Sequence, residues 1–156
     1  MSTTTPGQKA IFSKILVAID GSDASMDAAD YAISISKQHN VELLYALHVI
    51  HPADADLFGS TGEMTTAAYY IIDMNKEAQK YLDKVKLKAN EKNVQIKTEV
   101  IASTNTAGGI VDYAEDKDVD LIIIGTRGKS GFKKILLGSV ASKVVTYAHC
   151  PVMVVK

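Results

Sequence analysis

The sequence predicts an α/β fold, a five-stranded parallel sheet in the order 3-2-1-4-5 with helices on both faces. Strand-like and helix-like segments alternate five times along the chain, as they do in repeated strand–helix units. Residues 15–19 and 121–124 are entirely apolar, which indicates two central strands covered on both faces. In this order the connections reverse direction between strands 1 and 4, so we expect a crevice at their carboxyl ends.

Length and composition indicate one globular domain. The chain has 156 residues, 47% hydrophobic and 22% charged, which is sufficient to bury a core without disulfides or metals. We expect residues 1–12 to form a flexible N-terminal tail and residues 13–156 to form a single domain. Cys150 is the only cysteine, which excludes an internal disulfide and fits a reducing cytosol.

Charge and hydropathy argue against several classes of partner. The net charge is -1, so nothing favours a polyanion such as DNA or RNA. No apolar run approaches the roughly 18 residues of a membrane-spanning helix, and the first residues lack the regions of a signal peptide. We therefore expect a cytoplasmic protein that binds neither nucleic acid nor membrane.

The first half of the chain predicts strand, helix, strand, loop and long helix. Ser22 or Asp23 can cap the first helix. Apolar residues recur at helical spacing from Ala78 to Ala89, which indicates the buried stripe of the long helix, and lysines populate its other faces as a solvated surface. The five elements are expected at residues 14–20, 23–40, 41–50, 51–66 and 67–90.

The second half predicts strand, helix, strand, helix and strand, at residues 94–101, 104–116, 119–124, 140–148 and 152–155. The first of these strands alternates in part between apolar and polar residues, which is typical of a strand near a sheet edge. The last strand, Val152–Val155, is entirely apolar although it would also lie at an edge. It is either covered by its own helices or pairs with a second copy of the chain. We favour a homodimer through this edge strand.

A spaced set of small residues surrounds the end of the fourth strand. Gly125 and Gly128 follow the strand, and Gly138 and Ser139 precede the last helix. Small residues let backbone N–H groups approach phosphate oxygens, and a helix N-terminus adds unpaired donors and positive potential. We therefore predict that this loop and helix bind the phosphates of a nucleotide.

Charged and polar residues beside the glycines support this prediction. Lys129 and Arg127, the only arginine, offer positive charge next to the phosphates, although Arg127 could equally be an exposed charge. Ser139 is both an N-cap candidate and a hydroxyl donor. Asp20, at the end of the first strand, would face the same crevice.

Other phosphate and catalytic motifs do not fit. A P-loop would need glycine at position 123, where Ile123 belongs to the strand, and G-x-G-x-x-G is absent after the first strand. A phospho-acceptor site at Asp20 would need further acidic residues and a lysine at strand ends, which the third strand lacks. The four histidines do not have metal-ligand spacing, and neither a Ser-His-Asp arrangement nor G-x-S-x-G is present.

The pattern G-x-x-G-x9-G-[ST] resembles the signature of the ATP-binding type of universal stress protein. The resemblance extends from about residue 12 to the end, through Lys14 to Ser22, His48-Val49-Ile50 and the closing segment from Pro151. It implies an adenine-nucleotide alpha-hydrolase-like fold and an ATP site. In this site Asp20 would lie by the adenine, Val49 would line the base pocket, and Ile124 and Gly125 would lie along the ribose. Gly128, Lys129 and Ser130 would wrap the phosphates, with N–H groups from Gly138, Ser139 and Val140.

The function expected from residues and resemblance together is a nucleotide-dependent regulatory or stress-response module. It would bind ATP, with Mg²⁺ or Mn²⁺ held through the phosphates, and would hydrolyse it slowly or not at all because no base or nucleophile is positioned. The alternatives are a slow ATPase or autophosphorylating enzyme that uses Ser130, Ser139 or a nearby threonine, and an interaction protein whose pocket stays empty.

Overall fold

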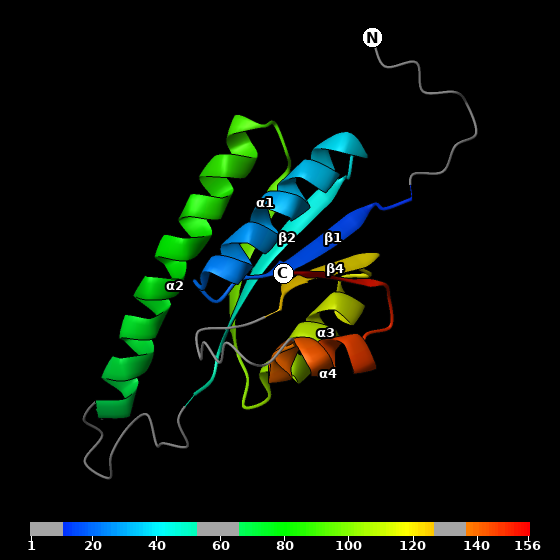
Figure 1. Ribbon diagram of the computed structural model, residues 1–156. Coiled ribbons are helices and arrows are strands. Elements are labelled where there is room, and N and C mark those ends of the chain that lie inside the picture. Colours follow the sequence, from blue (N-terminus) through cyan, green and yellow to red (C-terminus); the bar gives the residue numbers. More distant parts are fainter. Residues whose placement is uncertain (1–10, 53–65, 127–136) are drawn as a thin grey trace, which may run out of the picture.

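The computed structural model describes residues 11–52, 66–126 and 137–156. Its five strands form one parallel sheet in the order β3-β2-β1-β4-β5, which confirms the predicted architecture (Figure 1). The strands are β1 (Lys14–Ala18), β2 (Leu43–Ile50), β3 (Ile96–Ala102), β4 (Leu121–Gly125) and β5 (Val152–Val155).

Helices cover both faces of the sheet, as the sequence predicted. One apolar cluster joins the sheet to α1 and α2, and a second joins it to α3 and α4 on the opposite face (Figure 1). The four helices of the described chain are α1 (Asp23–Gln38), α2 (Thr66–Glu91), α3 (Thr106–Asp116) and α4 (Ser139–Tyr147).

The central strands contain the most deeply buried side chains. Leu16 of β1 and Ile122 of β4 contribute to one cluster, and Ile15 and Ile123 contribute to the other. All four are fully buried. Burial on both faces explains why, apart from Lys14 at the start of β1, these two strands carry no polar side chain.

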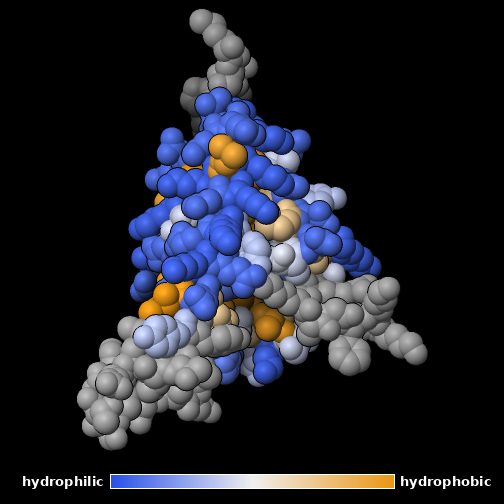
Figure 2. Space-filling model, turned by 90° about the vertical axis from the view of Figure 1, so that its left-hand side faces the viewer, coloured by the Kyte–Doolittle hydropathy of each residue, from blue (hydrophilic) through white to orange (hydrophobic). Residues whose placement is uncertain are grey.

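The predicted cap of α1 and the predicted buried stripe of α2 are both present. In α1 the Ser22 side chain accepts from the Ser25 N–H, so Ser22 is the N-cap. In α2 the predicted stripe from Ala78 to Ala89 is buried, including Leu82 and Val85. The outer surface on the α2 side of the molecule is mostly hydrophilic (Figure 2). No described helix is both long and apolar enough to cross a membrane.

Some boundaries differ from the predictions. Strand β1 ends at Ala18, whereas the sequence predicted residue 20. The last helix begins at Ser139 with Gly138 as its N-cap, and no side chain supplies a capping hydrogen bond. The interpretation of Ser139 as the N-cap was therefore wrong. Most of the predicted tail and of the predicted 51–66 loop lies outside the described residues.

Candidate functional site

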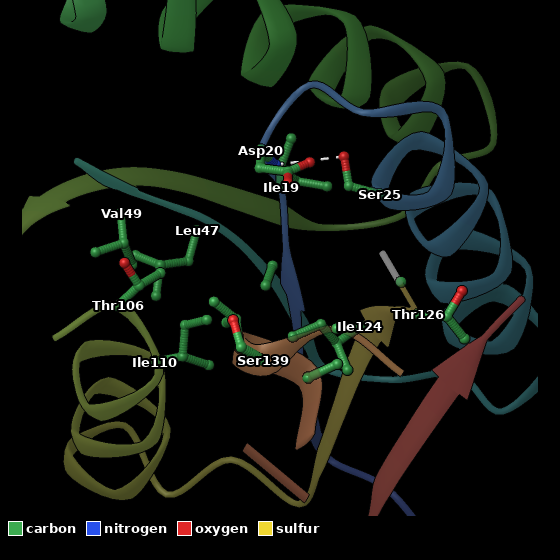
Figure 3. Close-up of a pocket in the computed structure, with 15 residues that line it drawn as sticks. Ile19, Asp20, Ser25, Leu47, Val49, Thr106, Ile110, Ile124, Thr126 and Ser139 are labelled. Carbon is green, nitrogen blue, oxygen red and sulfur yellow. Dashed lines mark hydrogen bonds between the residues drawn. The ribbon is translucent and has the colours of Figure 1, made fainter. Parts of the chain in front are cut away.

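A cavity of about 130 Å³ lies where the carboxyl ends of β1 and β4 meet the amino ends of α3 and α4 (Figure 3). This is the crevice predicted at the topological switch point of the sheet. A volume of this size is much larger than one water molecule needs. The cavity brings together the predicted residues Asp20, Val49, Ile124, Gly125, Gly138, Ser139 and Val140.

Four other predicted residues are not placed by the structure. Arg127, Gly128, Lys129 and Ser130 lie outside the described residues. They belong to the stretch between Thr126 and Leu137, and these two flanking residues are described. Thr126 lines the cavity, and its carbonyl accepts from the Gly138 N–H at 2.6 Å. The two glycine-containing ends of the motif are therefore joined directly.

A hydrogen-bond network fixes the Asp20 carboxylate at the β1 end. Its Oδ1 accepts from the Ser22 N–H at 2.9 Å and from the Ser22 hydroxyl. The Asp20 N–H donates to Ser25 Oγ at 3.3 Å, and the Ser25 hydroxyl donates to the Ser22 carbonyl at 2.9 Å. The described chain offers Oδ2 no comparable donor, so Asp20 keeps one acceptor oxygen for a ligand.

Gly21 makes the sharp turn between Asp20 and α1 possible. Its φ is +82°, a left-handed conformation that favours glycine. A Cβ at this position would lie 2.3 Å from ring atoms of Tyr81 in α2. The turn that carries Asp20 is therefore packed directly under the long helix.

Gly125 allows β4 to approach α1 closely. A Cβ at this position would lie 2.8 Å from the backbone carbonyl carbon and oxygen of Ala24. The following residue, Thr126, donates its N–H to the Val155 carbonyl at 2.8 Å. Gly125 thus has a packing role in addition to lining the cavity.

Within the described residues, the amino end of α4 presents backbone N–H donors that have no hydrogen-bond acceptor. The first backbone bond of this helix runs from the Ser142 N–H to the Gly138 carbonyl at 2.9 Å. The N–H groups of Ser139, Val140 and Ala141 therefore precede the first helical acceptor, and all three residues line the cavity. Because Gly138 has no side chain to cap them, these donors and the positive end of the helix are available to an anion.

Another part of the cavity wall is largely apolar. Leu47, Val49 and Ile110 lie together on one side of the cavity, with the Thr106 side chain beside Val49 (Figure 3). An apolar wall with a few polar groups is typical of a small-molecule site. Among the described residues no group of three or more His, Cys, Asp or Glu side chains is arranged to hold a metal.

Sequence reasoning missed several lining residues, notably Thr106, Thr126 and Ser25. Thr106 is the first residue of α3. Helices that follow parallel strands begin at the carboxyl edge of the sheet, so the predicted order could have indicated Thr106. No pattern in the sequence distinguishes Ser25 from other helical serines, because its role depends on the geometry of the Asp20 turn.

The fold and the cavity define a parallel α/β protein in which the amino end of a helix faces a cavity at the switch point of the sheet. Comparison with known families identifies the group. The model of the universal stress protein family matches residues 12–156, and the chain belongs to this family.

Individual relatives of the chain support this family assignment. The chain is 42% identical to universal stress protein MJ0531 of Methanocaldococcus jannaschii, over 94% of this chain and 83% of that protein. It is 40% identical to universal stress protein YxiE of Bacillus subtilis, over 94% of this chain and 100% of that protein.

Solved structures show the same fold. Universal stress protein UspA from Lactobacillus plantarum has a TM-score of 0.76 and 27% identity, over 95% of this chain and 100% of that one. The universal stress protein from Archaeoglobus fulgidus in complex with dAMP has a TM-score of 0.65 and 23% identity, over 94% and 99%.

Proposed function

We propose that the cavity binds ATP and that the protein acts as a nucleotide-dependent regulatory or stress-response module. One observation carries the proposal: the uncapped amino end of α4 opens into a cavity whose far side carries Asp20. The site therefore has two different polar ends, with donors for an anion at one end and an acceptor at the other. An adenine nucleotide, with phosphates at one end and an amine-bearing base at the other, matches this polarity.

No single interaction supplies enough free energy for micromolar binding of a nucleotide, so several interactions must combine. A helix amino end stabilises an anion by about 0.3–1 kcal/mol, up to ~2 kcal/mol when partly buried. Micromolar affinity requires about 8 kcal/mol. Burial of the base against Leu47, Val49 and Ile110 adds to the helix end. In this proposal the phosphates also contact Arg127, Gly128, Lys129 and Ser130.

A structural relative supports the choice of ligand class. The Archaeoglobus fulgidus protein of the same fold was solved with dAMP, which is an adenine nucleotide. Slow turnover is part of the proposal because Asp20 is the only carboxylate in the described lining and is hydrogen-bonded to Ser22. A slow ATPase or autophosphorylating enzyme is the alternative, and phosphate release would reveal it.

A divalent ion, Mg²⁺ or Mn²⁺, would be held mainly by the nucleotide. The described lining supplies one carboxylate, whereas these ions take several oxygen ligands. When bound, the ion would neutralise phosphate charge. The protein's own part is to place N–H donors and, in this proposal, Lys129 around the phosphates.

The edge strand β5 supports a homodimer. The other edge, β3, carries Lys97 and Glu99, which pair at 3.2 Å, and charged residues protect an edge from association. Strand β5 has no charged residue, and its Met153 is 37% exposed. We propose that two copies associate through β5.

The proposal is tested by changing the α4 cap. Gly138→Asp places a carboxylate where the phosphates would bind, while Gly138→Asn has nearly the same shape without charge. We expect the Asp variant to lose ATP affinity at least tenfold more than the Asn variant. Calorimetric titration with ATP measures both, and equal affinities would show that α4 does not bind the phosphates.

A further inference from the structure

His48 lies on a wall strand of the cavity without facing it. Successive side chains of a strand point to opposite faces. Leu47 and Val49 line the cavity, so His48, between them, faces the side covered by α1 and α2. It is 9% exposed, which is well below what a surface histidine would show.

The His48 ring holds the end of β1. Its Nδ1 lies 2.6 Å from the Ile19 carbonyl oxygen, and a carbonyl only accepts, so Nδ1 carries the proton and donates. The Ile19 N–H donates to the Leu47 carbonyl at 2.8 Å. Both backbone groups of Ile19 are therefore held by β2, and the next N–H, that of Asp20, donates to Ser25.

The hydrogen bond from the His48 side chain takes the place of one backbone hydrogen bond between β1 and β2. In a regular parallel ladder, the Ile19 carbonyl would accept from the N–H of Val49, two residues beyond Leu47. Within the described chain, the last backbone bond between these strands is Ile19 to Leu47. The Val49 N–H is thus left on the side of β2 where β1 has ended and the cavity begins.

We propose that His48 is a positioning residue of the nucleotide site. By occupying the Ile19 carbonyl, it leaves the Val49 N–H free to donate to an acceptor nitrogen of the base, and it fixes the peptide that presents Asp20. An adenine carries ring-nitrogen acceptors and an amine donor on its edges, so one donor and one acceptor from the protein suit it. The inference rests on the proposed ATP site.

The test compares two substitutions and two ligands. His48→Leu keeps the bulk but removes the donor, which frees the Ile19 carbonyl to take the Val49 N–H. We expect ATP affinity to fall about tenfold. Inorganic tripolyphosphate contacts only the phosphate end, so its affinity should be unchanged. His48→Asn restores a donor near the Nδ1 position and should recover ATP affinity to within about threefold of wild type.

Three results would overturn the inference: an unchanged ATP affinity in His48→Leu, an equal loss for both ligands, or no recovery in a folded His48→Asn protein. The wild-type protein provides a second measurement that does not depend on the variants folding. Its Val49 amide resonance should shift on addition of ATP and stay in place on addition of tripolyphosphate, and an unshifted resonance contradicts the inference. Wild-type protein that binds no ATP would instead overturn the proposed function.

Discussion

Gly125 shows how a single missing side chain positions the site. Because the nearest atoms to a Cβ at this position belong to the Ala24 backbone, Gly125→Ala should force β4 and α1 apart. We expect the free energy of unfolding to fall by about 1–3 kcal/mol, measured by urea denaturation without nucleotide. Gly109→Ala is the matched control, since a Cβ there would meet Ser103 at 3.1 Å, and it should cost less than Gly125→Ala. Equal effects would contradict the packing role of Gly125.

Tyr113 is a second residue whose surroundings have a measurable consequence, because they make the stability of the protein depend on pH. Its buried hydroxyl has no partner that meets hydrogen-bond geometry in the described chain, and the Glu99 carboxylate lies near it without meeting that geometry. Burial, followed by the nearby Glu99 carboxylate, raises the pKa of the Tyr113 phenol well above its usual range. The neutral phenol therefore contributes stability that is fully present below the unfolded-state pKa of about 10 and is lost as pH rises towards the folded-state pKa.

Tyr113→Phe should reveal this linkage. Below pH 10 the variant should unfold within about 1 kcal/mol of wild type, because no hydrogen bond is lost. Above pH 10 the wild-type free energy of unfolding should fall more steeply than that of the variant, by up to about 1.4 kcal/mol per pH unit. Denaturant titrations at several pH values measure the difference, and parallel curves would contradict the assigned environment.

At the scale of elements, the α3 helix depends on its cap. The Asn105 side chain accepts from the Gly108 N–H at 3.0 Å, and Thr106, the next residue, lines the cavity. Asn105→Ala should lower the free energy of unfolding by about 1 kcal/mol. Asn105→Asp retains an acceptor and should lose much less. Thermal or urea unfolding compares them, and equal losses would mean that the cap bond contributes nothing.

Strands were predicted well where their burial produces a recognisable pattern of apolar residues. The apolar runs of β1 and β4 placed both strands at the centre, and the alternation in β3 placed it at an edge. Boundaries were predicted less well because local hydrogen bonds decide them. Strand β1 stops at Ala18 because the chain then turns through Gly21, and Gly138 caps α4 because its N–H is held by Thr126. Neighbouring Gly and Ser cannot be ranked as caps from sequence alone.

In the site, too, features that depend on local hydrogen bonds could not be predicted from the sequence. Asp20 and Gly138 could be predicted because strand ends and helix starts meet at one edge of a parallel sheet. The contact between His48 and Ile19 could not, because it depends on where one strand ends relative to its neighbour. A histidine in an otherwise apolar strand gives no indication of its partner.

At the scale of the whole molecule, the two sheet edges differ. Met153→Lys puts a charge on the apolar β5 edge, where backbone pairing would bring two such lysines together. We expect sedimentation to show a dimer for wild type and a monomer for the variant, with an unchanged circular dichroism spectrum. Ala102→Lys, at the exposed end of β3, is the control and should remain dimeric. A dimeric Met153→Lys protein would place the interface elsewhere.

The central claim is that the cavity between β1 and β4 binds ATP. Calorimetric titration of nucleotide-free wild-type protein with ATP and Mg²⁺ tests it most directly. We predict saturable binding with one site per chain and a dissociation constant in the micromolar range, about 8 kcal/mol of binding free energy. The absence of saturable binding at millimolar ATP would contradict the account.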